Sequence, residues 1–274
     1  MLRVENISKD YGKFTALDGF TYDFSNGIHA ILGPNGSGKS TLMNIITGNL
    51  DASRGNFEFL SGENKPMSDI NIGYVPQYPA MYPQFTAYEM MDYMAILKKA
   101  SNRKEQITEL LEMFGLSEYS GKKIKALSGG TKQRLAIAQS LIGSPDLVIF
   151  DEPTAGLDPL QRIQFKNSIA KYKKETIIII STHIVSDVED IADKVIFLSH
   201  GKTVRHGTID EVTKDLSGKC WSISHTGNTK GFSLSRVDGN QVRIISETKP
   251  CEEAVSALPV LEDCYLNIFG KETV

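Results

Sequence analysis

One glycine-rich loop limits what this chain can fold into more than any other feature of the sequence. Residues 33–41 read GPNGSGKST, which fits the pattern of a glycine, four further residues and then Gly-Lys-Ser. An apolar run, IHAIL at 28–32, precedes the loop, and a helical pattern, KSTLMNIIT, follows it and stops at Gly48. A strand, a glycine-rich loop and a helix in that order predict a phosphate-binding loop.

The residue types in this loop suit phosphate chemistry. Glycines let consecutive backbone N–H groups curl around phosphates, while Lys39 bridges the outer phosphates and the Ser40 hydroxyl reaches Mg²⁺. The candidate phosphate-binding residues are Gly33, Pro34, Asn35, Gly36, Ser37, Gly38, Lys39, Ser40 and Thr41. A merely flexible glycine loop is the alternative, which the flanking strand and helix disfavour.

A pair of acidic residues follows another apolar run. In LVIFDEPT, the run at 147–150 ends in Asp151 and Glu152. A carboxylate at a strand tip can hold a metal ion through water, and one near the terminal phosphate can polarise an attacking water molecule. Acidic residues also commonly end strands and cap helices, so this pair becomes specific only in combination with the phosphate loop.

The stretch LSGGTKQR at 127–134 begins a helix with two glycines. The apolar residues of the following LAIAQSLI recur with helical spacing, although glycine weakens a helix start. Ser128 as the N-cap, followed by bare backbone at Gly129 and Gly130, is typical of a helix N-terminus that approaches an anion closely.

The order of the other patterns predicts an α/β fold. Alternating apolar residues at 2–4 and 20–24 indicate an antiparallel sheet at the N-terminus. From 87 to 143 the pattern is helical, and Ala87, Met90, Met91, Met94 and Leu97 are expected to share one face that is either core or partner-facing surface. Short β-branched runs at 147–150 and 177–181, separated by a helical stretch, predict parallel strands covered on both faces.

The end of the chain, from about residue 216 to 274, predicts a small α+β extension. FSLSRVDGNQVRII predicts a hairpin around Asp238-Gly239, and CEEAVSALPVLEDCYLNIF predicts helical pieces. Packing against the core is the simplest role for this extension, with regulation or dimerisation as alternatives.

The composition excludes several classes of protein. Thirty Lys and Arg against 33 Asp and Glu give a net charge of −3, so bulk basicity of the kind that draws proteins onto nucleic acid is absent. The three cysteines, Cys220, Cys251 and Cys264, lack zinc-site spacing and are expected to be reduced structural thiols. We expect no signal peptide and no membrane span, because the best apolar candidate, 80–97, contains a proline and two acidic residues.

Five motifs in a fixed order resemble the nucleotide-binding subunit of an ABC transporter. They are the phosphate loop, YVPQ at 74–77, LSGGTKQR, LVIFDEPTAGLD and STH at 181–183. The resemblance spans about residues 1–215. It implies a P-loop NTPase core with a mostly parallel sheet, an N-terminal antiparallel β subdomain and an inserted α-helical subdomain at about 78–143, followed by the extension at 216–274.

The resemblance also implies roles in ATP binding and hydrolysis. Tyr11 matches the aromatic residue that stacks on adenine, Glu152 the general base, and His183 the histidine that contacts the γ-phosphate and orients the attack. By themselves, Tyr11 would be a surface aromatic and His183 a strand-end histidine. Ser40, Gln77 and Asp151 match the residues around Mg²⁺, and Gln77 also couples the helical subdomain to the core.

A second ATPase subunit, in a homodimer or a heterodimer, is implied by the same family pattern. Ser128, Gly129 and Gly130 would face the γ-phosphate of ATP bound to the other subunit, and Asp158 would lie on a loop that crosses between the subunits. Asp158 precedes a proline and is therefore also a good helix N-cap, and both roles can hold. Thr131 stands where glutamine is most common in this motif. This departure bears on the expected rate of hydrolysis or affinity for ATP, and not on the role of the motif.

The family implies a separate integral membrane permease as partner, with the chain peripheral on the cytoplasmic face of the membrane and no nucleic acid bound. PVLEDCYLNIFG resembles the end of stand-alone ATPase subunits of bacterial exporters for drugs, antibiotic peptides and polysaccharide or lipid cargo. One alternative is a soluble ABC-type ATPase acting on ribosomes or nucleic acid. Another is a regulatory module that binds ATP without hydrolysing it, against which Glu152 and His183 argue.

Overall fold

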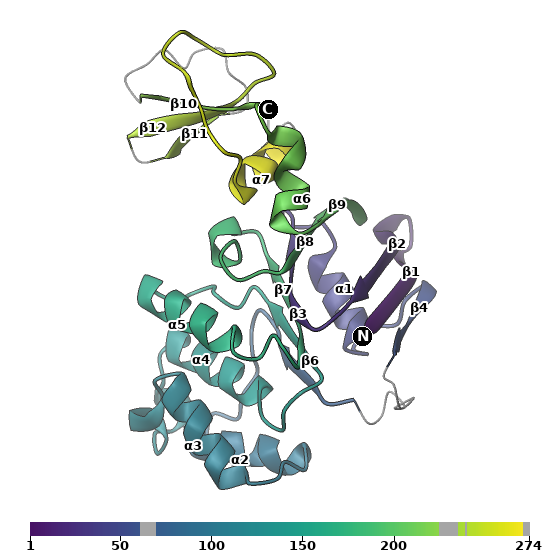
Figure 1. Ribbon diagram of the computed structural model, residues 1–274. Coiled ribbons are helices and arrows are strands. Elements are labelled where there is room, and N and C mark those ends of the chain that lie inside the picture. The colour runs from purple at the N-terminus through teal and green to yellow at the C-terminus, as the bar shows by residue number, and fades with distance from the viewer. Residues whose placement is uncertain (61–69, 225–234, 239, 271–274) are drawn as a thin grey trace.

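A computed structural model describes residues 1–60, 70–224, 235–238 and 240–270. A six-stranded sheet forms the centre of the protein, with a three-stranded antiparallel sheet beside it and a helical segment on the other side (Figure 1). A small four-stranded sheet lies at the C-terminal end of the chain. The predicted α/β architecture is therefore confirmed.

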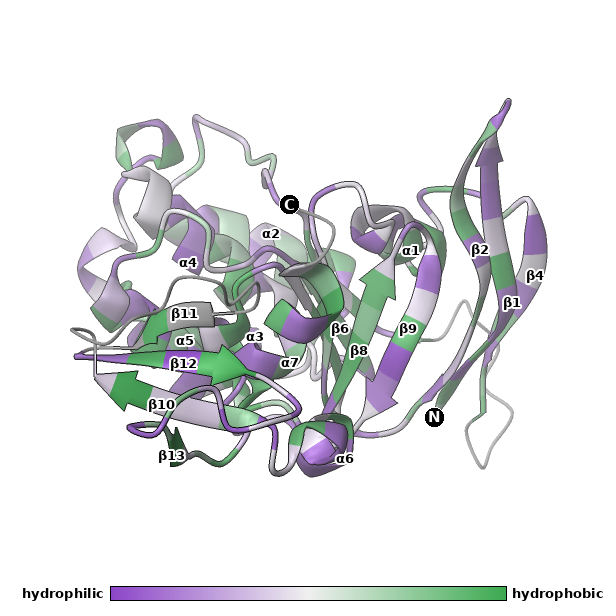
Figure 2. Ribbon diagram, turned by 90° about the horizontal axis from the view of Figure 1, so that it is seen from above, coloured by the Kyte–Doolittle hydropathy of each residue, from purple (hydrophilic) through white to green (hydrophobic). Residues whose placement is uncertain are grey.

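The central sheet has the strand order β5-β6-β7-β3-β8-β9. All neighbouring strands are parallel except β8 and β9, which form an antiparallel pair. The strands are β5 (Ile72–Val75), β6 (Leu147–Asp151), β7 (Ile177–Thr182), β3 (Gly27–Leu32), β8 (Lys194–Ser199) and β9 (Lys202–Gly207). Figure 2 shows that β6 and β8 are largely hydrophobic along their length, as expected of strands covered on both faces.

The register of these strands decides where the site lies. Leu32 at the end of β3 pairs with Thr182 at the end of β7, and Asp151 at the end of β6 pairs with Ser181. The phosphate loop, the acidic pair and the histidine each follow one of these strand ends. Because carboxyl ends of parallel strands meet at one edge, three motifs that are distant in sequence converge there.

The N-terminal antiparallel sheet has the order β2-β1-β4, with β1 (Leu2–Tyr11), β2 (Phe14–Phe24) and β4 (Arg54–Phe59). The predicted sheet is confirmed, and its third strand comes from after the phosphate-loop helix α1 (Lys39–Ile46). Leu42, Ile45 and Ile46 of α1 pack in one apolar cluster with residues of both sheets. Burial of this helix face fixes the loop between the two sheets.

Four longer helices lie on the other side of the central sheet: α2 (Ala87–Leu97), α3 (Arg103–Met113), α4 (Gly129–Ser140) and α5 (Pro159–Ile169). Helix α4 contacts β5 of the sheet, whereas α2 and α3 pack against each other and against α4. Thr86 begins α2 with a reciprocal capping box to Glu89. Met90 and Met91 are buried as core, whereas Leu97 is 57% exposed because α2 ends there, so the predicted common face divides between core and surface. Short 3₁₀ turns are η2 (Ser117–Tyr119), η3 (Ile124–Ala126), η4 (Val185–Asp187) and η5 (Lys214–Leu216).

The C-terminal part contains α6 (Ile209–Thr213), a sheet of order β11-β12-β10-β13 and a final helix α7 (Leu261–Phe269). The strands are β10 (Cys220–Ser224), β11 (Ser235–Asp238), β12 (Gln241–Ile245) and β13 (Val255–Ser256). The predicted hairpin is confirmed by antiparallel β11 and β12, although Gly239 of its turn lies outside the described residues. Of the helical pieces predicted within 251–269, α7 is present in the second half, whereas Val255–Ser256 in the first half form β13 and pair with β10.

Helix α7 packs back into the main core, although it follows the small sheet in sequence. Leu261, Cys264 and Phe269 share the apolar cluster of the central sheet, and the rings of Phe269 and Phe197 of β8 lie 6.2 Å apart. The three cysteines are reduced, as predicted. None of the helices in the described part of the chain has the length and hydropathy of a membrane span.

Candidate nucleotide-binding and catalytic site

A cavity of about 230 Å³ lies at the edge of the central sheet where the motifs converge. Its lining comes from four parts of the chain: the β1–β2 hairpin, the phosphate loop with the start of α1, the loop after β5 and the loop after β6. The lining residues are Tyr11, Phe14, Ala16, Asn35, Gly36, Gly38, Lys39, Ser40, Thr41, Gln77 and Glu152.

The phosphate loop requires glycine for two separate reasons. Gly38, the N-cap of α1, has φ 105°, a backbone conformation that residues with a side chain rarely adopt. Gly33 has no room for a side chain, because a Cβ atom there would lie 2.2 Å from the backbone oxygen of Leu198. No side chain caps α1 and no acidic residue lies in its first turn, so its first N–H groups suit an anionic ligand.

Lys39 is buried beneath this loop. Its Nζ atom donates hydrogen bonds to the backbone oxygens of Gly33 at 2.8 Å and Pro34 at 3.1 Å, and lies 3.9 Å from Oε1 of Glu152. Burial lowers the pKa of Lys39, and the negative charges of Glu152 and Asp151 partly oppose that effect. The loop carbonyls and carboxylates thus hold the ammonium beside the cavity.

Glu152 lies between Lys39 and His183. Its Oε1 atom is 2.9 Å from Nδ1 of His183, and its Oε2 atom accepts a hydrogen bond from the Thr182 hydroxyl at 3.2 Å. The backbone of Glu152 has φ 51°, an uncommon conformation for a residue other than glycine. A carboxylate held by a lysine, a histidine and a hydroxyl is suited to accept a proton at a fixed point.

The residues predicted around Mg²⁺ divide into two groups. Ser40 and Gln77 line the cavity, whereas Asp151 is buried at the tip of β6, where one of its oxygens accepts a hydrogen bond from Ser181. Among the described residues, no three His, Cys, Asp or Glu side chains form a metal-binding group. Hydroxyl, amide and carboxylate oxygens with added water and phosphate ligands nevertheless fit Mg²⁺, which seldom occupies an all-protein cage.

The loop also contains a buried polar atom with no partner. The Ser37 hydroxyl oxygen makes no hydrogen bond to the described part of the chain. A buried hydroxyl without a partner is unfavourable, and a ligand oxygen can satisfy it. This atom is further support for a polyanion in the loop.

The predicted subunit-crossing residues lie outside this cavity. Ser128 caps α4 by accepting a hydrogen bond from the backbone N–H of Thr131 at 3.2 Å, as predicted. Asp158 caps α5 in the same way, accepting from the backbone N–H of Gln161 at 2.8 Å. A Cβ atom on Gly129 would meet nothing within 4 Å, so the helix start is open at Gly129, whereas a Cβ atom on Gly130 would lie 2.9 Å from Oε1 of Gln161.

Sequence patterns missed two residues that line the cavity, Phe14 and Ala16. Phe14 pairs with Tyr11 across the β1–β2 turn, so two exposed aromatic rings lie at the mouth of the site. The available signal was a second aromatic residue three positions after Tyr11, on the other side of a glycine turn.

The family model for "ABC transporter" matches residues 17–155, slightly more than half of the chain. The chain belongs to the ABC transporter family. It is an ATP-binding subunit with ATPase activity of the ABC type.

Curated relatives agree with this assignment. The chain is 35% identical over 235 residues to the uncharacterised ABC transporter ATP-binding protein YxlF of Bacillus subtilis, covering 85% of this chain and 79% of that protein. It is 38% identical to the lantibiotic transport ATP-binding protein SrtF of Streptococcus pyogenes (74% and 89% covered). It is 33% identical to the linearmycin resistance ATP-binding protein LnrL of B. subtilis (80% and 72% covered).

Solved structures share the fold. A dimeric structure of MJ0796, a bacterial ABC transporter cassette, has a TM-score of 0.69 at 27% identity and covers 76% of this chain and 98% of its own. CbiO1 of Clostridium perfringens, part of an ABC transporter complex, has a TM-score of 0.67 at 31% identity, with 78% and 90% covered. The ABC subunit therefore has the P-loop architecture that the motif order predicted.

Proposed function

We propose that two copies of this ABC subunit close around two ATP molecules and that hydrolysis drives a separate membrane-spanning permease, which exports an antibiotic-type cargo. The observation that carries the hydrolytic part is the position of Glu152 between Lys39 and His183 at the cavity wall. The export part is supported by relatives named for lantibiotic transport and linearmycin resistance.

In the proposed reaction, the protein contributes positioning and electrostatics. Tyr11 stacks on adenine, the loop amides and Lys39 stabilise negative charge on the transferring phosphoryl group, and Glu152 accepts the proton of the attacking water. His183 contacts the γ-phosphate and keeps Glu152 oriented through their short contact. Mg²⁺, held by Ser40, Gln77 and Asp151 with water and nucleotide oxygens, would neutralise phosphate charge.

The N-terminus of α4, at Ser128, Gly129 and Gly130, is proposed to face the γ-phosphate of the second subunit's ATP, with Asp158 at the same interface. Open space at Gly129 supports this, because an anion could approach the backbone there. The MJ0796 cassette, which is similar in fold, forms a dimer. We propose that the permease contacts the helical subdomain near Gln77 and residues 78–100, with the chain on the cytoplasmic face of the membrane.

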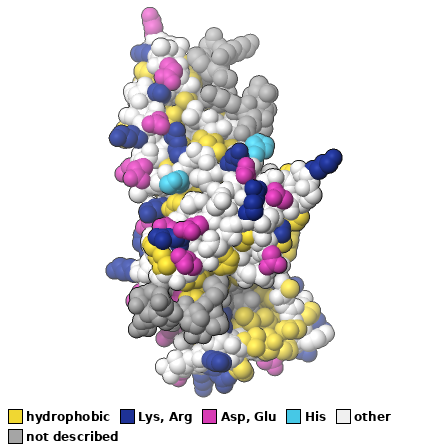
Figure 3. All heavy atoms as spheres, turned by 90° about the vertical axis from the view of Figure 1, so that its right-hand side faces the viewer, with side chains coloured by type: hydrophobic (Ala, Val, Ile, Leu, Met, Phe, Trp, Pro, Cys, Tyr) yellow, Lys and Arg dark blue, Asp and Glu magenta, His cyan; other side chains and the backbone are white. Residues whose placement is uncertain are grey.

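The surface charges on one face of the molecule do not favour nucleic acid as the partner. On the face shown in Figure 3, Lys and Arg side chains lie among Asp and Glu side chains. Such a mixed surface differs from the continuous basic stripe typical of nucleic-acid binding. The alternative, an ABC-type ATPase that acts on ribosomes, is distinguished by the experiment described next.

Purification of the tagged chain from its native cells tests the transport assignment. We expect an integral membrane permease to copurify and to stimulate ATP hydrolysis when both are placed in liposomes. Cells with the pair should resist lantibiotic-type or linearmycin-type antibiotics, and cells carrying Glu152→Gln should not. Copurification with ribosomes and no permease would contradict the proposal.

A further inference from the structure

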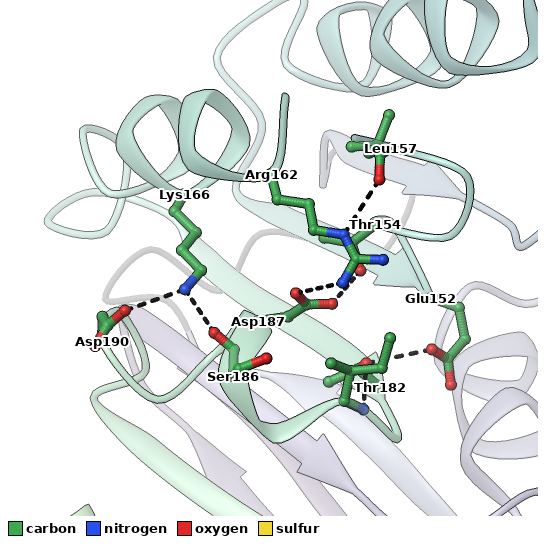
Figure 4. A network of polar contacts seen from close by, with 10 residues as sticks. Glu152, Thr154, Leu157, Arg162, Lys166, Thr182, Ser186, Asp187 and Asp190 are labelled. Atoms are coloured by element: carbon green, nitrogen blue, oxygen red, sulfur yellow. Dashed lines mark hydrogen bonds and ion pairs between the residues drawn. The ribbon is translucent and has the colours of Figure 1, made fainter. Parts of the chain in front are cut away.

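Asp187 is a buried carboxylate outside the cavity. It ends η4 four residues after His183, and its side chain is 4% exposed. Its Oδ2 atom accepts a hydrogen bond from the Thr154 hydroxyl, and its Oδ1 atom accepts one from the Arg162 guanidinium at 3.2 Å (Figure 4). A buried charge is unfavourable unless it is paired, so these contacts hold the three side chains firmly together.

The three residues belong to three segments, each of which also carries a site residue. Thr154 follows Glu152 by two positions, and Asp187 follows His183 by four. Arg162 lies on α5, which Asp158 caps, and its Nε atom also donates to the backbone oxygen of Leu157 at 3.3 Å. Asp187 therefore connects the loop of the base, the loop of the histidine and the start of α5.

The loop after Glu152 depends on contacts of this kind. Glu152 has a strained backbone, which persists only where the surrounding structure holds it. The backbone oxygen of Pro153 accepts from Gln133 of α4 at 3.0 Å, and Thr154 contacts Asp187. Loss of either contact leaves the carboxylate of Glu152 with more ways to move relative to His183.

We propose that Asp187 is a positioning residue for ATP hydrolysis. Through Thr154 it fixes the position of Glu152 relative to His183. Through Arg162 it couples that position to the start of α5 at Asp158, which is proposed to contact the second subunit. Asp187 touches neither nucleotide nor water in this proposal, and acts through Thr154. The inference rests on the proposed role of Glu152 as the base.

A second ion pair joins α5 to the segment that follows His183 and provides a matched control. Lys166 of α5 contacts Asp190 at 3.1 Å, close to Asp187 in sequence and space, yet the Asp190 side chain is 79% exposed (Figure 4). Exposed pairs contribute little to stability because water screens them. Comparison of variants at the two aspartates therefore distinguishes the positioning of Glu152 by Asp187 from the general effect of an ion pair between α5 and this segment.

The experiment compares Asp187→Asn with Asp190→Asn in the full chain. Misplacement of a catalytic group by about 1 Å can lower a rate about 100-fold, so we expect kcat of Asp187→Asn to fall by at least about 30-fold. The Kd for ATP should change by less than about twofold, since Asp187 lies outside the cavity. Asp190→Asn should keep both values within about twofold.

Thr154 supplies a second, isosteric pair of variants. Thr154→Val removes the hydroxyl that contacts Asp187 and should lower kcat as Asp187→Asn does, whereas Thr154→Ser keeps the hydroxyl and should restore most of the rate. If Asp187→Asn gives no folded protein, the Thr154 pair carries the same prediction. The double variant Thr154→Val/Asp187→Asn should lose no more rate than either single variant.

Two results would overturn the inference: equal kcat for Asp187→Asn and Asp190→Asn, or parallel losses of ATP affinity and kcat, which indicate general damage. The proposed function is judged separately by wild-type hydrolysis and by Glu152→Gln. If Glu152→Gln is inactive while Asp187→Asn is fully active, the proposed base stands and the positioning role of Asp187 is wrong.

Discussion

The Nδ1 atom of His183 lies 2.9 Å from the Oε1 atom of Glu152, although 31 positions separate the two residues in sequence. A carboxylate can only accept a hydrogen bond, so Nδ1 donates in this contact. The contact exists because β6 and β7 are neighbours in register, which brings their carboxyl ends together. It orients the carboxylate toward the cavity that Lys39 also borders.

Replacement of Glu152 by Gln should separate binding from chemistry. The amide keeps the shape of the side chain but cannot accept the proton of water, so turnover should fall at least about 100-fold. ATP binding and ATP-dependent dimerisation should remain, as measured by nucleotide titration and size-exclusion chromatography. Normal turnover in this variant would remove Glu152 from the role of base.

Replacement of Gly129 by Asp should block hydrolysis without harming the monomer. The Cβ position is open, and an acidic residue in the first helical turn is stabilising by roughly 0.3–1 kcal/mol. A negative charge there should nevertheless repel the γ-phosphate of the second subunit. We expect an unchanged Kd for ATP, no ATP-driven dimer and little hydrolysis, with Gly129→Ala as the milder control; undiminished hydrolysis would contradict the two-subunit site.

The two aromatic rings at the cavity mouth should both bind adenine. Stacking of an aromatic ring on a base is worth about 1–3 kcal/mol, so Tyr11→Ala or Phe14→Ala should raise the Kd for ATP by roughly 5-fold to 150-fold. Tyr82 lies outside the cavity with a similarly exposed ring, and Tyr82→Ala should leave the Kd unchanged. If Phe14→Ala leaves the Kd for ATP unchanged, Tyr11 alone stacks on adenine.

Lys98 should give the protein a measurable pH dependence of stability. Its ammonium donates to the backbone oxygens of Ser140 and Ile142 at the end of α4, and burial lowers its pKa to about 8. Unfolded lysine has a pKa near 10.4, so between about pH 8 and 10.4 the unfolded state binds more protons, and stability rises with pH. Below pH 8 both states are protonated and the penalty of burial is present in full.

Denaturant unfolding at pH 7.5 and pH 9.5 measures this effect. The difference in free energy of unfolding between the wild type and Lys98→Met should become more favourable to the wild type from pH 7.5 to pH 9.5. Lys99 is an exposed neighbour, and the difference between the wild type and Lys99→Met should stay the same over this range. Equal pH dependence in the two variants would show that Lys98 keeps an ordinary pKa.

Two leucines near the C-terminus test whether α7 belongs to the main core. Leu261 is 0% exposed at the start of α7, and Leu258 is 86% exposed just before it. Leu261→Ala should lower the free energy of unfolding by about 2–5 kcal/mol, and Leu258→Ala by less than about 0.5 kcal/mol. A small, separate unfolding transition in Leu261→Ala, with an unchanged main transition, would show instead that residues 216–274 form an independent unit.

Much of the candidate site was predictable because its features are local. The phosphate loop needs glycine backbone at Gly38, and the caps of α4 and α5 join residues three positions apart, Ser128 to Thr131 and Asp158 to Gln161. Interactions of such short range are determined by residue type and spacing. Strand and helix identity in the core followed for the same reason from apolar periodicity.

Local sequence patterns therefore predicted the phosphate-binding segments, the helix starts and the family that the motifs resemble. Long-range packing puts β7 between β6 and β3, so that Glu152 contacts His183, and it brings Asp187 into contact with Thr154 and Arg162. It also decided that α7 returns to the main core. These contacts link residues far apart in the chain, and they depend on strand order and burial, which no local pattern encodes.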